Sequence, residues 1–264
     1  MTNPLRKLQD HGQSVWLDDI RRDLIQGGDL ARLIREDGLR GVTSNPAIFN
    51  KAIAESDLYD GALRALPDGS PKDWYEALAV ADIQAACDAF APVYADTDGG
   101  DGFVSLEVSP RLAHDTLATV DEARRLWARV DRPNVMIKVP ATPEGLPAIE
   151  TLIAEGINVN VTLIFSLAQY RAVCDAHLAG LRRRQAKKLP LNVVASAASV
   201  TLNPIDPLAA PLLDADDLPA RYALGVLHMA CLERPADAVA QFRAYVDGGG
   251  SDAKVRGWLQ ALQR

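Results

Sequence analysis

The sequence has few cysteines and no long apolar run. Its three cysteines, Cys87, Cys174 and Cys231, are far apart and odd in number, which argues against a disulfide framework or a zinc site. No apolar run approaches the roughly 18 residues of a membrane-spanning helix, and the first residues show no apolar core of a secretion signal. We therefore expect a cytoplasmic protein that has no membrane partner.

Basic residues are also in deficit. The chain has 28 Lys and Arg against 35 Asp and Glu, so its formal net charge is -7. This balance argues against a general nucleic-acid-binding surface. Histidines are scarce and scattered, and we expect no metal site among His11, His114, His177 and His228.

What the chain does have is an alternation of short β-like runs with longer helical segments. This order favours an α/β fold with parallel strands, and a length of 264 residues suits a (β/α)8 TIM-type barrel. We expect strands near 14–17, 41–43, 102–108, 134–139, 157–163 and 191–196. We expect helices near 30–36, 115–129, 144–155 and 167–184, with a long helical excursion over 56–96.

The last quarter of the chain has a different pattern. We recognise no strand after residue 203, so the barrel is either incomplete or closed by residues whose pattern does not show strands. We therefore divide the chain into a barrel region, 1–206, and a helical C-terminal segment, 207–264. That segment resembles a single tetratricopeptide-like helix pair, and an ordinary amphipathic pair explains it too. Since one repeat is not stable alone, it must pack on the barrel or on a partner.

Lys138 is the most informative residue. It lies in the apolar run Val135–Val139, which reads as a buried strand that Pro140 ends. A buried lysine is uncommon unless it is paired or has a task. Desolvation makes a lysine amine easier to deprotonate, and a neutral amine attacks carbonyl carbon to form a Schiff base. The alternative is an internal ion pair.

Other polar residues also lie near the ends of the expected strands. In a barrel of parallel strands, the carboxyl ends carry the reacting groups. Each residue has a structural explanation: Asp18 could cap a helix, Asn45 suits a turn, Glu107 could pair with an arginine, and Asn160 and Thr162 could bond to backbone. Together they favour a site, because five strands then direct polar groups to one end.

Five motifs, in order and spacing, resemble the transaldolase family over about residues 5–184. They are Ser14–Ile20, Gly41–Phe49, Ser105–Arg111, Ile137–Leu146 and Gly156–Ser166. The resemblance implies a class I aldolase-type barrel that needs no metal or organic cofactor. The implied reaction, in the pentose phosphate pathway, transfers a dihydroxyacetone unit from a ketose phosphate to an aldose phosphate.

The resemblance also implies roles for the catalytic residues. Lys138 would form the imine with the donor ketone, and Asp18 would exchange a proton with the hydroxyl at the bond that breaks. Glu107 and Thr162 would hold the water that shuttles protons during imine formation.

The same resemblance implies a substrate-binding set. Asn45 and Asn160 would bond to the hydroxyls of the dihydroxyacetone unit, with Ser105 nearby. Ser196 begins the nearest match to the family's phosphate motif and is assigned to substrate binding. The arginine of that motif is replaced by Thr201, which lacks the bidentate fork that suits a phosphate.

Three hypotheses follow from this sequence. The chain is a working transaldolase with a remodelled phosphate end, an aldolase relative that uses a nonphosphorylated substrate, or a pseudoenzyme that serves binding. An incomplete barrel would expose strand edges, so dimerisation is a further hypothesis. The basic run Arg182–Arg184 is interpreted as a solvated helix face.

Overall fold

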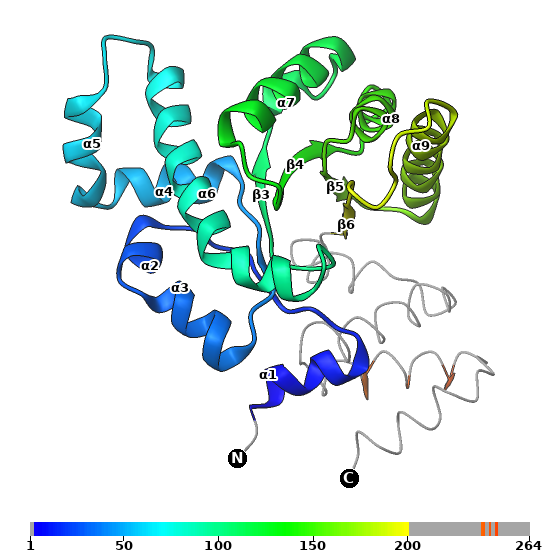
Figure 1. Cartoon of the computed structure of the whole chain (residues 1–264), viewed down its shortest axis with the longest axis horizontal. Coiled ribbons are helices and arrows are strands. Elements are labelled where there is room, and N and C mark those ends of the chain that lie inside the picture. Colours follow the sequence, from blue (N-terminus) through cyan, green and yellow to red (C-terminus); the bar gives the residue numbers. More distant parts are fainter. Residues whose placement is uncertain (1–2, 201–238, 241–242, 244–245, 248–264) are drawn as a thin grey trace. The chain divides into compact units, whose positions relative to one another are not determined.

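The structure is a computed structural model that describes residues 3–200, 239–240, 243 and 246–247 (Figure 1). The first of these ranges belongs to a compact unit that ends at Val200. The predicted C-terminal segment, 207–264, lies outside the described residues except at five positions, all of them helical: Val239, Ala240, Arg243, Val246 and Asp247. Cys231, His228 and Thr201 also lie outside.

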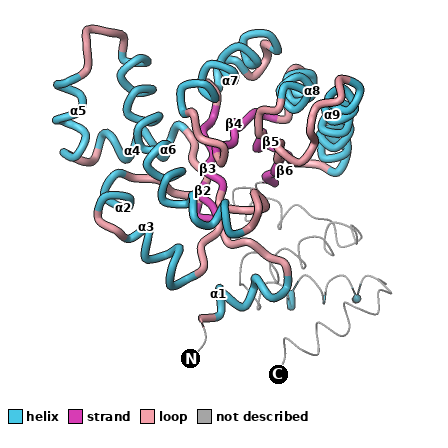
Figure 2. Tube along the Cα trace, viewed as in Figure 1, coloured by secondary structure: helices cyan, strands magenta, loops and turns pink. Residues whose placement is uncertain are grey.

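Six parallel strands form a curled sheet in which each strand pairs with its neighbour in sequence (Figures 1 and 2). They are β1 (Trp16–Leu17), β2 (Gly41–Val42), β3 (Phe103–Glu107), β4 (Val135–Pro140), β5 (Val159–Ile164) and β6 (Ser196–Val200). Helices connect the strands, which is the order that parallel pairing requires. The predicted parallel barrel architecture is confirmed over these six strands.

The helices lie around the sheet (Figure 2). The α-helices are α1 (Pro4–Lys7), α2 (Arg22–Gln26), α3 (Asp29–Arg32), α4 (Pro46–Ala54), α5 (Asp60–Ala65), α6 (Pro71–Asp96), α7 (Thr116–Val130), α8 (Gly145–Glu155) and α9 (Leu167–Ala186). Shorter turns are η1 (Leu8–His11), η2 (Leu33–Asp37), η3 (Asp57–Tyr59) and η4 (Pro110–Leu112).

Local sequence explains where the main helices begin. The Asn45 side chain accepts a hydrogen bond from the backbone at the start of α4, and Ser166 does the same for α9. Ser70 and Asp73 form a reciprocal capping box at the start of α6. Because α4 and α6 also begin with proline, which suits the first helical position, both starts are well determined by sequence.

The core lies between the sheet and the covering helices. Every residue of β4 is buried, which explains its nearly continuous apolar sequence. Ile137 and Val139 are fully buried on this strand, and Ile149 and Leu152 of α8 belong to the same cluster. The one charged side chain in β4, Lys138, is therefore held inside an apolar strand that cannot shift without exposing its neighbours.

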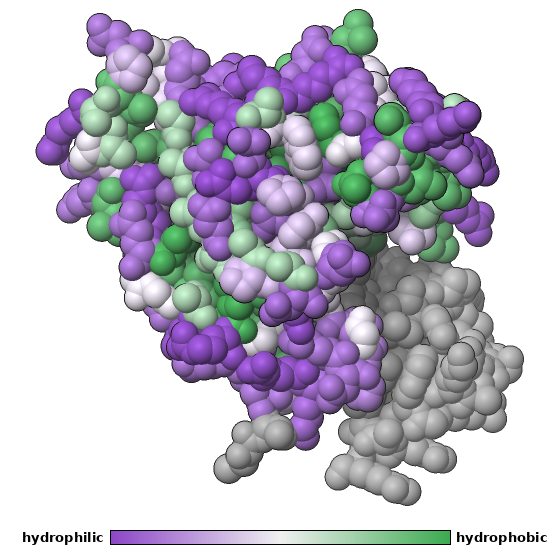
Figure 3. Space-filling model, viewed as in Figure 1, coloured by the Kyte–Doolittle hydropathy of each residue, from purple (hydrophilic) through white to green (hydrophobic). Residues whose placement is uncertain are grey.

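Figure 3 shows that hydrophilic side chains cover most of the drawn face, with smaller apolar patches between them. Within the described residues, no helix has both the length and the apolar character that crossing a bilayer requires.

Some predicted boundaries differ from the structure. The sixth strand begins at Ser196, whereas 191–196 was expected. Residues 191–193 form a bend and a turn, so the regular strand begins only at Ser196. Similarly, the excursion over 56–96 is two helices, α5 and α6, separated at residues 66–70 by a proline- and glycine-containing loop.

The interpretation of the basic run at the end of α9 was wrong for Arg184, which is 4% exposed. Its guanidinium donates to Pro190 O at 2.8 Å and lies against Gly156, the residue that ends α8. Gly156 has a φ of 91°, and a Cβ there would lie 2.5 Å from an Arg184 nitrogen. Arg184 therefore joins three chain segments and is not a solvated residue.

A buried ion pair attaches α2 to α6. Arg22 contacts Asp82 through two nitrogens at 2.9 Å each, and the Tyr59 hydroxyl donates to the other carboxylate oxygen at 2.7 Å. The Arg22 guanidinium also lies 4.2 Å from the centre of the Tyr59 ring. Since α2 follows β1 directly, this network determines where the segment carrying Asp18 runs.

We expect Asp82→Ala to lower the free energy of unfolding by about 3–5 kcal/mol, because it leaves the Arg22 charge buried and unpaired. The matched control is Asp88→Ala on the same helix, whose exposed pair with Arg132 is worth about 0–1 kcal/mol. Denaturant unfolding of both variants measures the difference, and equal losses would contradict the prediction.

Candidate active site

Lys138 on β4 lies among polar groups that come from the neighbouring strands of the sheet. Its side chain enters the barrel side of β4 and is only 8% exposed. Nζ donates to Ser44 O at 2.9 Å and lies 3.6 Å from Glu107 Oε2. The amine therefore has one carbonyl and one carboxylate as neighbours, and almost no contact with solvent.

The sheet register brings these groups together. Glu107 on β3 is the direct partner of Lys138 on β4, and Lys138 is the partner of Asn160 on β5. Because parallel partners point to the same face of a sheet, the three side chains form one row. The sequence analysis placed all three at strand ends, and the pairing shows that they lie at the same level.

Glu107 has the electrostatics of a base. Burial raises the pKa of its carboxyl group, the Lys138 charge opposes that rise, and the charge of Asp18 adds to it. A carboxylate with a raised pKa accepts a proton more readily, and it lies next to an amine that must lose one before it can attack a carbonyl. The sequence analysis considered an arginine as the partner of Glu107, whereas in the structure its partner is Lys138.

A second set of contacts extends from Asn160. Its Nδ2 donates to Ser105 Oγ at 2.9 Å, and its Oδ1 accepts from Ser199 Oγ at 2.7 Å. Ser44 Oγ in turn donates to Ser105 O at 2.6 Å. This chain of hydrogen bonds orients the Asn160 amide beside Lys138, and it links strands β3, β5 and β6.

The remaining predicted residues lie at the same end of the strands. Asp18 directly follows β1, where its side chain is exposed, and its charge reaches Glu107. Thr162 is 5% exposed on β5, two residues beyond Asn160. Asn45 follows β2, and its Oδ1 accepts from Ile48 N at 3.0 Å, so it caps α4 whatever else it does.

Ser196 is the predicted site residue that the structure does not group with the others. Its Oγ donates to Val159 O at 2.9 Å, and the side chain lies at the start of β6. The serine that contacts Asn160 is Ser199, which the sequence analysis did not select. The expected strand over 191–196 placed Ser196 at the carboxyl end; the true strand, 196–200, places Ser199 there.

Ser44 is a second residue that the sequence analysis missed. Its backbone carbonyl accepts a hydrogen bond from Lys138 Nζ, and its hydroxyl donates to Ser105 O on β3. A signal was present, because Ser44 directly precedes Asn45 in the motif at the end of β2. Only the tertiary structure shows that the backbone carbonyl of this residue is the closest partner of the amine.

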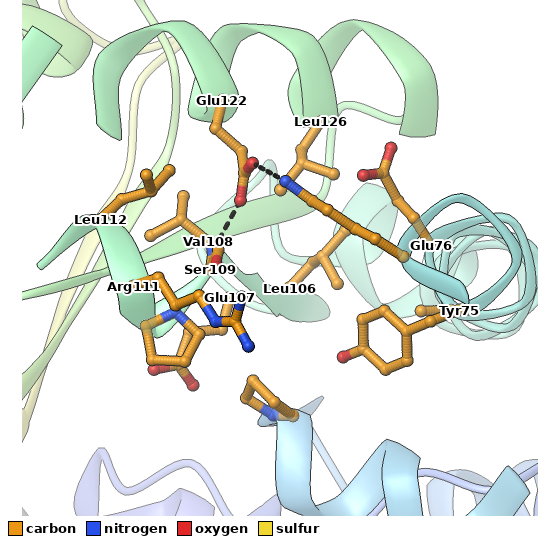
Figure 4. Close-up of a pocket in the computed structure, with 14 residues that line it drawn as sticks. Tyr75, Glu76, Leu106, Glu107, Val108, Ser109, Arg111, Leu112, Glu122 and Leu126 are labelled. Atoms are coloured by element: carbon orange, nitrogen blue, oxygen red, sulfur yellow. Dashed lines mark hydrogen bonds and ion pairs between the residues drawn. The ribbon is translucent and has the colours of Figure 1, made fainter. Parts of the chain in front are cut away.

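A pocket of about 340 Å³ adjoins this site behind the end of β3 (Figure 4). Its walls come from α4, α6, η4 and α7, and Glu107 forms part of one side. Figure 4 shows Tyr75 entering from α6 on the side opposite Glu107. Burial, together with the charges of Glu107 and Glu76, raises the pKa of Tyr75 to about 12, so its hydroxyl remains protonated.

Fold and site together define a class: an α/β-barrel protein with a buried lysine held between a carboxylate and an amide at the strand ends. The family model of transaldolase/fructose-6-phosphate aldolase matches residues 15–230, and the chain belongs to this family. The resemblance seen in the sequence motifs is thereby confirmed.

Relatives with known names agree. The chain is 55% identical to a transaldolase of Thermobifida fusca over 208 residues, which is 78% of this chain and 56% of the relative. It is 53% identical to a transaldolase of Thiobacillus denitrificans over 197 residues, 74% of this chain and 55% of the relative. The chain thus spans about half the length of the relatives it matches.

We expect Lys138→Met to lose stability as pH rises above the ordinary glutamate pKa of about 4.3, because Glu107 then has no cation beside it and its pKa rises further. A folded-state pKa above the unfolded value stabilises at low pH, and that contribution is lost as pH rises through the folded pKa. The control is Lys138→Met/Glu107→Gln, which has no carboxyl group to titrate there. Urea unfolding at several pH values compares them, and parallel pH profiles would refute the assignment.

Proposed function

We propose that the chain catalyses transaldolase-type transfer of a dihydroxyacetone unit from a ketose phosphate to an aldose phosphate, through an imine on Lys138. The carrying observation is the buried Lys138 amine, 3.6 Å from Glu107 and fixed by the Ser44 carbonyl. Membership of the family supports the same reaction.

The first step joins the amine to the ketone. Glu107 accepts a proton from Lys138, and the neutral nitrogen attacks the carbonyl carbon so that a C–N bond forms. Glu107 then returns its proton to the former carbonyl oxygen, and a second proton passes to this oxygen from the nitrogen. The oxygen leaves as water while the nitrogen lone pair forms the C=N bond of the iminium ion. We assign Thr162 to hold this water with Glu107, because the two residues belong to strands on either side of Lys138.

The second step breaks a carbon–carbon bond. Asp18 removes the proton of the hydroxyl next to that bond, the aldehyde departs, and the bonding electrons move into the iminium group as an enamine. An incoming aldose phosphate reacts with the enamine in the reverse sense. Asn45, Asn160 and Ser105 are assigned to the hydroxyls of the retained unit, and the Asn160 amide is already oriented for this by Ser105.

The substrate class we propose is a small sugar phosphate. The replacement of the family's phosphate-motif arginine by Thr201 makes phosphate affinity the property to measure first. An assay with fructose 6-phosphate and erythrose 4-phosphate tests transfer directly. If transfer is absent while borohydride traps dihydroxyacetone on the chain, the chemistry operates on a nonphosphorylated substrate.

Several properties stay predictions from the sequence. They are a homodimer, a cytoplasmic location, the absence of a nucleic-acid partner and the division into regions 1–206 and 207–264. Light scattering of the purified chain tests the dimer.

We expect Lys138→Ala to abolish the covalent adduct that borohydride traps from a ketose donor, because Lys138 is the residue to which we assign the imine. Lys72→Ala is the control, since that lysine is exposed and paired with Glu122. Mass spectrometry of the reduced protein reports the adduct. Trapping that persists in Lys138→Ala would remove this lysine from the mechanism.

We expect Glu107→Gln to slow imine formation by roughly 10²–10⁴, the usual contribution of a positioned acid–base group. The amide is similar in size but cannot accept the amine proton. The rate is measured by adding borohydride at successive times and quantifying the trapped adduct. Glu122→Gln is the control, because the Glu122 carboxylate lines the neighbouring pocket and pairs with Lys72 instead of Lys138. Equal effects of the two variants would contradict the role of Glu107.

A further inference from the structure

The pocket between α6 and α7 lies on the helix side of the sheet, outside the barrel interior. Leu106 and Val108 line it and flank Glu107 in sequence, so their side chains point away from the face that carries Glu107 and Lys138. Its volume of about 340 Å³ lies within the range of small-molecule sites, roughly 300–1,000 Å³. The pocket is therefore large enough for a ligand of its own, separate from the proposed sugar site.

Apolar side chains form the buried part of this pocket. They are Ala79, Leu106, Val108 and Leu126, all nearly inaccessible to solvent. Tyr75 adds an aromatic ring, which packs edge-on against Phe49 with 6.1 Å between ring centroids. Aromatic rings pair favourably with one another in edge-to-face and offset arrangements. These walls favour a ligand whose body is an apolar ring, and a cavity of roughly 150 Å³ already accepts benzene.

The charged groups around the pocket leave one cation without a partner. Each lining carboxylate has a cation: Glu76 pairs with Arg125 and Arg129, Glu122 with Lys72, and Glu107 with Lys138. Arg111 is exposed and lines the pocket, and within residues 3–200 no ion pair or hydrogen bond engages its guanidinium. The lining residues and their ion-pair partners thus comprise five cations and three carboxylates. This is a local surplus of positive charge in a chain whose net charge is -7.

Arg111 and Tyr75 offer hydrogen-bond donors from opposite sides of the pocket (Figure 4). An arginine guanidinium presents N–H groups in a planar fork that matches the two oxygens of a carboxylate. The Tyr75 hydroxyl keeps its proton, because burial and the charges of Glu107 and Glu76 raise its pKa to about 12, and it has no protein acceptor within residues 3–200. Two donors without an acceptor favour an anionic head group.

The lining also selects the charge of that head group. Because Glu76, Glu107 and Glu122 belong to the lining, a phosphate group with a charge near -2 is repelled more strongly than a group with a charge of -1. A carboxylate has a single charge and two oxygens, which suit one guanidinium fork and one hydroxyl.

We propose that this pocket binds a small aromatic carboxylate. Its head group bonds to the Arg111 guanidinium and the Tyr75 hydroxyl, and its ring packs against Leu106 and Leu126. Neither Arg111 nor Tyr75 has a role in the proposed transfer reaction, so the binding site stands whether or not the chain catalyses that reaction.

The first test is calorimetric titration of the full chain with benzoate. We expect benzoate to bind with a Kd below about 1 mM. Three further compounds separate the contributions: benzamide has the ring without the charge, acetate has the charge without the ring, and inorganic phosphate has the wrong head group. We expect each of them to bind at least about tenfold more weakly than benzoate.

The second test changes the two donors. We expect Arg111→Gln to weaken benzoate binding by about tenfold to a hundredfold, and Tyr75→Phe by about threefold to tenfold, the usual effects of losing a charged and a neutral hydrogen bond. Arg64→Gln is the control, because that exposed arginine pairs with Asp60 on α5 and does not line the pocket. Circular dichroism verifies folding, and Arg111 lies at the surface, so its replacement leaves the core intact.

The third test locates the ligand. The Lys138 ammonium group also attracts carboxylates, so benzoate is titrated into Lys138→Met as well. Unchanged affinity in Lys138→Met together with weakened binding in Arg111→Gln supports the proposal.

Four results would overturn the proposal. They are no binding of benzoate up to about 10 mM, equal or tighter binding of benzamide, acetate or phosphate, unchanged binding in a folded Arg111→Gln variant, and loss of binding in a folded Lys138→Met variant. The last result would place benzoate inside the barrel. An inactive chain in the transaldolase assay is a separate result, because it concerns the proposed function and leaves these titrations unaffected.

Discussion

The contact on which the site depends is the buried amine of Lys138 between the Ser44 carbonyl and the Glu107 carboxylate. An ammonium group is costly to bury unless it is paired and hydrogen-bonded, so both partners are needed for the strand to hold it. In the proposed mechanism the same two partners prepare the amine for reaction. The carbonyl fixes the direction of the nitrogen, and the carboxylate, whose pKa burial raises, can take its proton. The stability of β4 and the proposed chemistry therefore have the same requirement, namely that an apolar strand holds the Lys138 amine beside these two partners.

Packing around this contact follows from it. Because β4 is buried on both faces, its register is determined by apolar neighbours, and the register in turn aligns Lys138 with Glu107 and Asn160. A slip of one residue would send the lysine into the layer between sheet and helices. The hydrogen bonds from Asn160 to Ser105 and Ser199 extend the polar row across three strands, so the amide that we assign to substrate is oriented before a substrate binds.

The sequence by itself indicated the fold class, because apolar runs with single polar interruptions reveal strands and strand ends, and five motifs indicated the family. The same interruptions selected Lys138, Glu107 and Asn160 as candidate site residues, and the structure brings these three together. Contacts that involve backbone atoms, or that depend on where a strand begins, could not be predicted from the sequence. Ser44 contacts Lys138 through its carbonyl, which every residue has, and Ser199 contacts Asn160 because of the bounds of β6 and its pairing with β5. Arg184 was misread for the same reason: its burial depends on Gly156 of a different helix. Which side chains share a strand end is a local property, whereas which of them touch is decided by pairing between distant segments.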